Sequence, residues 1–171
     1  MTVQINYKSS GFKKNSNNLV LFVDEKFNIK ALKKDLSNSE FTYINDLLKN
    51  IDLKKNLFVF ELSSKKKIVL VSIKKNIKNF DIENLGAGLY GRINYGKSSE
   101  YSLNSNNIVS KYKNFIGYFL HGFKLKSYEF NKYKTKKDTR LITINVFGNK
   151  PSVNDLLKFK ALEEGTFYTR D

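Results

Sequence analysis

Residues 86–91, with the sequence GAGLYG, match the G-x-G-x-x-G pattern of dinucleotide-binding proteins. That pattern binds a pyrophosphate only where it forms the tight turn between a strand and a helix N-terminus, so that bare backbone amides face the ligand. Here the strand predicted upstream ends well before the first glycine, and the pattern falls inside a helical periodicity over residues 82–93. We therefore predict that Gly86, Gly88 and Gly91 are helical packing positions, and that a bulky residue at Gly88 would clash.

Side chains that carry out nucleophilic, acid–base or metal chemistry are scarce in this sequence. There is no cysteine, and His121 is the one histidine. This excludes a thiol nucleophile and any Cys-ligated metal site, and it argues against a His-based metal cluster or a Ser-His-Asp triad. Glu163 and Glu164 are adjacent, so on a helix they point about 100° apart and would not share an acid–base site. We interpret His121 as a structural residue and predict no catalytic and no metal-binding residue.

The densest basic segment spans residues 132–137 and follows two aromatic residues, Tyr128 and Phe130. Basic residues interleaved with aromatic ones can bind single-stranded nucleic acid through phosphate contacts and base stacking. Equally, the aromatic side chains can form the core face of a strand and the lysines an exposed turn. The candidate nucleic-acid-binding residues are Lys132, Lys134, Lys136 and Lys137.

The sign of the overall charge permits a polyanionic partner but does not require one. Lysine and arginine number 31 against 16 acidic residues, a net charge of +15, yet only three of the basic residues are arginines. Lysine lacks the planar fork that reads guanine bidentately, so a solvated lysine-rich face is the simpler interpretation. The longest apolar runs are far shorter than the about 20 residues of a membrane helix, and no signal peptide is apparent. We predict a cytoplasmic protein.

Hydrophobic periodicity predicts alternating strands and helices. The predicted strands are residues 3–7, 19–23, 57–62, 68–73, 101–103, 128–133 and 141–147. The predicted helices are residues 41–51 (capped by Asn38 or Ser39), 82–93, 108–123 and one that begins near residue 151. The linker between the third and fourth strands is too short for a crossover helix, so these two strands must be antiparallel. The fold class is therefore α/β, a mixed sheet of five or six strands with helices on both faces.

The last predicted helix has no later strand to pack against. We expect an apolar stripe made of Val153, Leu156, Leu157 and Ala161, with Phe167 further along. A stripe that can dock only partly on the preceding residues indicates a missing domain or a partner chain.

Two C-terminal segments carry a family pattern. Residues 122–136 are GFKLKSYEFNKYKTK, and residues 161–171 are ALEEGTFYTRD. The first resembles the stretch of M17 leucyl (cytosol) aminopeptidases in which a helix ends in G-x-x-L and continues as Y-x-F-x-x-Y-K-T-K. The second resembles the interdomain helix of that family and stops at the Arg-Asp of its R-D-L-x-N-x-P motif. Tyr168 and Thr169 stand where the family has a smaller residue, usually alanine.

The resemblance implies a macro-domain-like N-terminal domain over residues 1–150 and an interdomain helix over residues 151–171. In the family, the catalytic domain that follows holds two divalent metals, manganese or zinc, and removes N-terminal residues, preferably leucine, from peptides. Its subunits form hexamers, and all of its metal ligands and catalytic residues belong to that domain. The expected function is a non-catalytic domain that serves subunit assembly and active-site access. It would have no cofactor of its own, and its partner would be the catalytic domain of the same polypeptide.

Two other functions stay open. Some bacterial members of the family also bind DNA, which the basic surface permits. Macro domains bind ADP-ribose through a glycine-rich loop and an asparagine-containing motif, and neither has a convincing match in this sequence.

Overall fold

Six strands, four α-helices and one short 3-10 helix form the part of the chain that the computed structural model describes, residues 2–9, 11–12, 18–95, 97, 99–108, 114–128 and 140–170. The strands are β1 (Thr2–Lys8), β2 (Asn18–Asp24), β3 (Leu57–Ser63), β4 (Lys66–Ile73), β5 (Ser99–Asn104) and β6 (Leu141–Phe147). The helices are η1 (Lys30–Lys34), α1 (Asn38–Lys49), α2 (Asn79–Ile93), α3 (Phe115–Ser127) and α4 (Val153–Arg170).

The described strands form one mixed sheet in the order β1-β6-β5-β2-β4-β3. All neighbours are parallel except β3 and β4, which pair antiparallel with Phe60 opposite Ile68. The connection between Ser63 and Lys66 is too short for a parallel crossover, so the predicted mixed sheet is confirmed. The predicted strand over residues 128–133 lies outside the described residues, apart from Tyr128, which follows α3.

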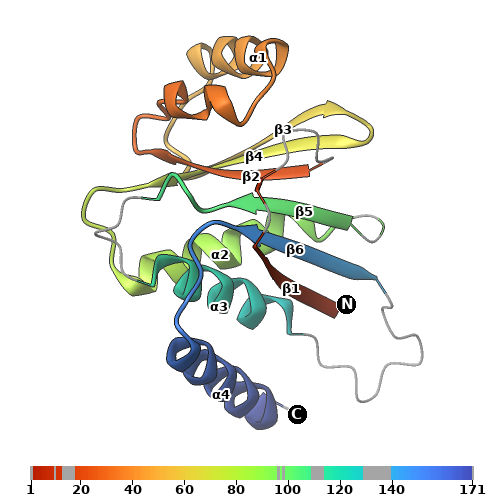
Figure 1. Cartoon of the computed structure of the whole chain (residues 1–171), viewed down its shortest axis with the longest axis vertical. Coiled ribbons are helices and arrows are strands. Elements are labelled where there is room, and N and C mark those ends of the chain that lie inside the picture. The colour runs from red at the N-terminus through yellow and green to blue at the C-terminus, as the bar shows by residue number, and fades with distance from the viewer. Residues whose placement is uncertain are drawn as a thin grey trace.

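Helices cover both faces of the sheet, as predicted (Figure 1). In β2, Leu19 and Leu21 point into a core shared with η1 and α1, whereas Val20 and Phe22 point into a second core shared with α2 and α3. A strand buried on both faces needs an apolar residue at every position, which explains the continuous run over residues 19–23. Helix α4 lies outside these layers and packs on α3 rather than on the sheet.

The starts of helices α1 and α3 differ from the sequence prediction. Helix α1 is capped by Ser37, whose hydroxyl accepts the Glu40 N–H while the Glu40 carboxylate accepts the Ser37 N–H at 2.9 Å. Helix α3 begins at Phe115 and not near Ile108, which lies in the turn after β5 and donates its N–H to the Ser105 carbonyl. Because Ile108 is buried in the same core as α3, periodicity alone extended that helix too far.

The predicted helical glycines are confirmed as residues of α2, but their roles differ. A Cβ at Gly86 would overlap the backbone of Phe119 in α3, and a Cβ at Gly122 would overlap the backbone of Glu83 in α2. These two glycines therefore let the two helices touch backbone to backbone. For Gly88 and Gly91 the prediction is wrong, because a Cβ there would meet no atom within 4 Å.

Candidate functional site

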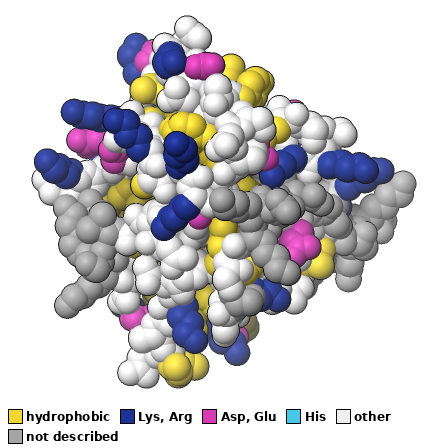
Figure 2. All heavy atoms as spheres, turned by 45° about the horizontal axis from the view of Figure 1, so that its top comes forward, with side chains coloured by type: hydrophobic (Ala, Val, Ile, Leu, Met, Phe, Trp, Pro, Cys, Tyr) yellow, Lys and Arg dark blue, Asp and Glu magenta, His cyan; other side chains and the backbone are white. Residues whose placement is uncertain are grey.

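The lysines predicted to contact nucleic acid, Lys132, Lys134, Lys136 and Lys137, lie outside the described residues, so that hypothesis stays a prediction. On the face seen in Figure 2, the basic side chains are spread among acidic ones rather than gathered in one patch. Local pairs such as Lys49 with Asp46 (2.9 Å) are typical of a solvated surface. Within the described ranges, no helix combines the length and apolar character that crossing a lipid bilayer requires.

The histidine lies in a buried polar cluster between α3 and α4. His121 Nδ1 is 3.0 Å from Glu163 Oε1, and Lys124 Nζ donates a hydrogen bond to Glu163 Oε2, also at 3.0 Å. The ring of Phe159 packs against the His121 ring, with 5.0 Å between centroids, and occupies the space above Gly117. The sequence indicated a structural histidine but not its partner, because Glu163 is 42 residues away along the chain.

This cluster does not fit a divalent metal. The ammonium group of Lys124 already supplies the positive charge beside Glu163, and an ammonium group cannot act as a ligand. Among the described residues, no three His, Cys, Asp or Glu side chains are grouped so that they could hold a metal ion. The resemblance places the two-metal centre in a catalytic domain that would follow these residues, so that expectation stays a prediction.

Tyr7 on β1 makes the stability of the folded chain sensitive to alkaline pH. Burial, and then the charge of Glu163, raise the pKa of the Tyr7 phenol to about 12 from its ordinary value of 10.0. The folded chain therefore holds this proton more tightly than the unfolded chain does. We expect the contribution of Tyr7 to the free energy of unfolding to be constant below about pH 10 and to fall as pH rises from about 10 to about 12.

Denaturant unfolding across this pH range checks the prediction. Tyr7→Phe should flatten the fall, whereas Tyr95→Phe, at a tyrosine that is 77 % exposed, should leave it unchanged. Both variants keep every lysine, so the effect of lysine titration on stability is the same in both and drops out of the comparison. Equal slopes in both variants would contradict the assignment to Tyr7.

Helix α4 has two faces, and the predicted stripe is wrong for Val153, Leu157 and Ala161, which are exposed. The buried residues are Phe159 and Glu163, with Leu156 half-buried beside them. The outer face of α4 consists of the exposed residues Val153, Leu157, Ala161 and Tyr168. Val153 is 73 % exposed, Leu157 61 % and Tyr168 85 %. Both sets recur at helical spacing, so periodicity alone cannot tell which one docks on α3.

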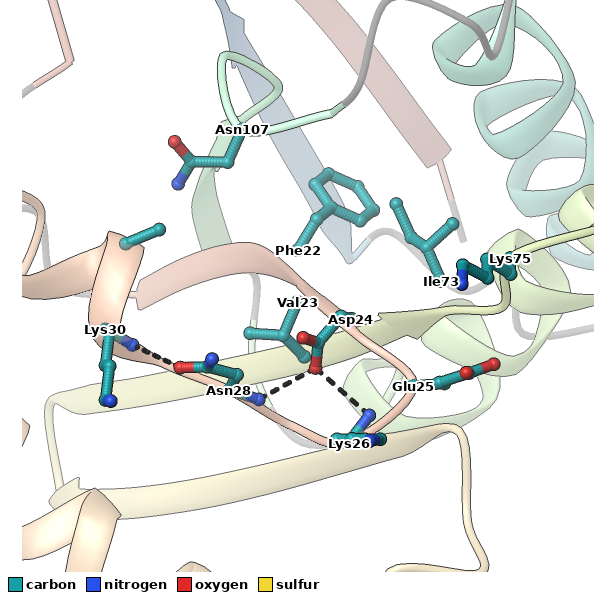
Figure 3. A pocket seen from close by; sticks show the side chains of 11 residues that line it. Phe22, Val23, Asp24, Glu25, Lys26, Asn28, Lys30, Ile73, Lys75 and Asn107 are labelled. Carbon is teal, nitrogen blue, oxygen red and sulfur yellow. Dashed lines mark hydrogen bonds between the residues drawn. The ribbon is translucent and has the colours of Figure 1, made fainter.

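A pocket of about 760 Å³ opens at the carboxyl ends of β2 and β4, and we call it the strand-end pocket (Figure 3). Its apolar lining includes Phe22 and Ile73, which belong to the core under α2 and α3, and Val23, which belongs to the core on the opposite face of the sheet. Its rim includes Lys30 at the start of η1 and Asn107 from the loop after β5. The volume falls within the about 300–1,000 Å³ of small-molecule sites.

The loop that borders this pocket is held in one conformation by its own side chains. Asp24 Oδ1 accepts the backbone N–H groups of Lys26 at 3.0 Å and of Asn28 at 2.9 Å (Figure 3). Phe27 has a φ of 54°, in the left-handed region, and its buried ring packs against Phe58. A bulky residue rarely adopts this conformation, and strained loops of this kind are concentrated at functional sites.

Sequence reasoning missed this pocket, although one signal was present. Asp24 directly follows the buried run of residues 19–23, and polar residues at the carboxyl end of a buried parallel strand often line a site. What the sequence could not reveal is that Ile73 of β4 and Asn107 from the loop after β5 both reach this pocket.

Comparisons with known proteins give matches at the level of structure. No family model matches the sequence, and no curated protein matches it. A variant of tomato leucine aminopeptidase superposes with a TM-score of 0.64 and 14% sequence identity, over 95% of this chain and 36% of the enzyme. The chain has the fold of a part of leucine aminopeptidase. The bottromycin maturation enzyme BotP, solved in complex with Mn, matches with a TM-score of 0.58 and 9% identity, over 89% of this chain and 30% of that chain.

The aminopeptidase match confirms the α/β fold class and the structural likeness to leucine aminopeptidase that the sequence predicted. The chain spans only about a third of the length of the two solved proteins, and the identities are low, so the likeness concerns fold and not activity.

Proposed function

We propose that the chain is the non-catalytic N-terminal domain of a leucyl-aminopeptidase-like exopeptidase. Residues 1–150 form the domain, and residues 151–171 form the interdomain helix that leads to a catalytic domain. The observation that carries the proposal is the outer face of α4, an apolar stripe that nothing in the described chain covers. The aminopeptidase match over 95% of the chain supports it.

In this function the domain contributes no catalytic side chain. It serves subunit contacts and limits access to the peptidase site, while a catalytic domain binds two divalent metals, manganese or zinc, and removes N-terminal residues from peptides. The proposal extends to a cytoplasmic, homo-oligomeric parent enzyme, with a hexamer as the expected assembly. Apolar helix faces of this kind are typical of elements that pack on a second partner.

Hydrogen exchange along α4 tests the proposal. In the 171-residue chain alone, we expect the amides of residues 164–170 to exchange faster than those of β6. Apart from Thr166 and Phe167, which are half-buried, the residues of this helix end are exposed, and an isolated helix end is marginal in water. Extending the chain by the coding sequence that follows residue 171 should slow exchange along α4. The short chain should release no leucine from leucyl amide, with or without manganese or zinc.

A matched pair of variants separates docking of the outer face from folding. With Leu157→Asp, extending the chain should no longer slow amide exchange along α4. The same substitution should leave the stability of the short chain within about 0.5 kcal/mol of its original value, since Leu157 is exposed. Lys158→Asp, at the adjacent exposed position, should keep the slowing. Protection of residues 164–170 equal to that of β6 in a monomeric short chain would refute the proposal, as would a stop codon directly after residue 171.

A further inference from the structure

Strand β3 forms one edge of the sheet, and in the described part of the chain its outer side has no strand partner (Figure 1). Ser72 donates its N–H to the Asn56 carbonyl at 2.8 Å, and hydrogen-bonded and non-hydrogen-bonded pairs alternate along an antiparallel ladder. Residues 58 and 60 therefore turn their N–H and C=O groups toward β4. The corresponding groups of Leu57 and Val59 point to the open edge, where they can pair with another chain.

The first half of β3 lacks the features that usually prevent such pairing. Edge strands are commonly protected by charged residues, prolines or bulges. Glu61 and the register shift between Glu61 and Ser63 protect only the end of β3. Residues 57–60 have the sequence LFVF, with no charge and no proline. This half of β3 is therefore a template for an added strand.

A cleft of about 520 Å³, which we call the basic cleft, adjoins this part of the edge. It lies between Leu57 at the start of β3 and the flank of α2 that carries Gly88 and Arg92. Gly86 contacts α3, and Gly88 lies about 200° further around the helix, so this flank faces away from α3. Because a Cβ at Gly88 would meet no atom within 4 Å, this wall of the cleft leaves room for an incoming chain.

The charges around the basic cleft favour an acidic occupant. Its lining holds one carboxylate, that of Asp81, and four exposed cationic side chains, those of Lys54, Lys55, Lys74 and Arg92. Asp81 is engaged at the start of α2, where its Oδ2 accepts the Lys78 N–H at 3.4 Å. Lys54 forms only a solvent-exposed pair with Asp52, which another carboxylate can replace at little cost. The net charge of +15 repels a second copy of this chain and attracts an acidic one.

We propose that the edge of β3 and the basic cleft bind an extended acidic segment of a partner protein by β-strand addition. The main chain of the segment pairs with Leu57 and Val59, whose side chains lie on the α2 side of the sheet. Every second side chain of the added strand points to that same side, so carboxylates at alternate positions reach the cations of the cleft. This site is separate from the proposed interdomain role, since no residue of α4 lines the cleft.

Amide hydrogen exchange of the 171-residue chain, measured by NMR, tests the proposal. The probe is a synthetic peptide of about seven residues in which glutamate and valine alternate. In the free chain, the amides of Leu57 and Val59 should exchange faster than those of Phe58 and Phe60. Saturating peptide should slow exchange at Leu57 and Val59 about tenfold or more. A peptide with lysine in place of glutamate has the same strand pattern and should bind at least about tenfold more weakly.

Methylation of the peptide nitrogens shows whether binding uses strand pairing. In an added strand, the N–H groups of alternate residues face β3 and the others face away from it. N-methylation of one alternate set, either all the glutamates or all the valines, should therefore abolish binding. Methylation of the other set should keep the affinity within about threefold of the original.

Two variants with the same change in net charge locate the acidic side chains. Arg92→Glu should weaken binding of the glutamate peptide about tenfold or more, through charge reversal in the cleft. Lys33→Glu, at an exposed position of η1 outside the cleft, should keep the affinity within about twofold of the original. The amide spectra report whether each variant is folded.

Four outcomes would overturn the assignment. The first is no slowing of exchange at Leu57 and Val59 at about 1 mM glutamate peptide. The second is equal loss of binding with either methylated set, and the third is equal loss in Arg92→Glu and Lys33→Glu, which would indicate diffuse electrostatic attraction. The fourth is tighter binding of a random-sequence oligonucleotide than of the peptide at the same residues, which would assign the cleft to nucleic acid.

Discussion

Replacing Gly86 or Gly122 by alanine is expected to destabilise the folded chain by about 3 kcal/mol. At each position the new methyl group would overlap backbone atoms of the facing helix, Phe119 for Gly86 and Glu83 for Gly122. Backbone cannot rotate away as a side chain can, so α2 and α3 would have to separate. Both helices help to form the core on one face of the sheet, and their separation would also loosen their contacts with β2 and β5.

Thermal and denaturant unfolding measure this effect, and the same helix provides its control. Gly88→Ala adds the same methyl group where no atom lies within 4 Å, so it should stabilise by about 0.5–1 kcal/mol through helix propensity. For a chain of this size, each kcal/mol corresponds to about 2–4 °C in Tm. Helix propensity acts equally at both positions. Similar losses of stability in Gly86→Ala and Gly88→Ala would therefore contradict the contact between Gly86 and the Phe119 backbone.

Removal of the Glu163 carboxylate is expected to have the second largest effect. Glu163→Ala should destabilise the chain by about 2–3 kcal/mol, because His121 is buried and loses its partner. Lys124 is partly exposed and can turn to water, so its share of the loss is smaller. The loss should be concentrated at α4, whose amides would exchange faster while β2 and β4 stay protected.

The neighbouring residue supplies the matched control. Glu164 is 68% exposed and makes only a surface pair with Lys160, so Glu164→Ala should change the free energy of unfolding by less than about 0.5 kcal/mol. Glu163→Gln keeps the shape and one acceptor oxygen, and should fall between the two. If Glu163→Ala behaved like Glu164→Ala, the buried cluster would not be what holds α4 on α3.

Local signals in the sequence were sufficient for most of the fold. The apolar run over residues 19–23 predicted a strand buried on both faces, and the short connection between β3 and β4 predicted their antiparallel pairing. The error at the start of α3 has a physical cause. Ile108 is buried through a turn, not a helix, and burial leaves the same apolar signal in either conformation.

The sequence by itself determined the α/β fold class and excluded thiol chemistry, because the alternation of apolar residues and the absence of cysteine are properties of the chain. The tertiary structure alone decided which positions meet. It places Gly86, but not Gly88, against the backbone of α3 and sets His121 beside Glu163. It also brings the ends of β2, β4 and β5 together around the strand-end pocket. These are contacts between residues far apart along the chain, and they depend on how helices and strands stack, which no local pattern encodes.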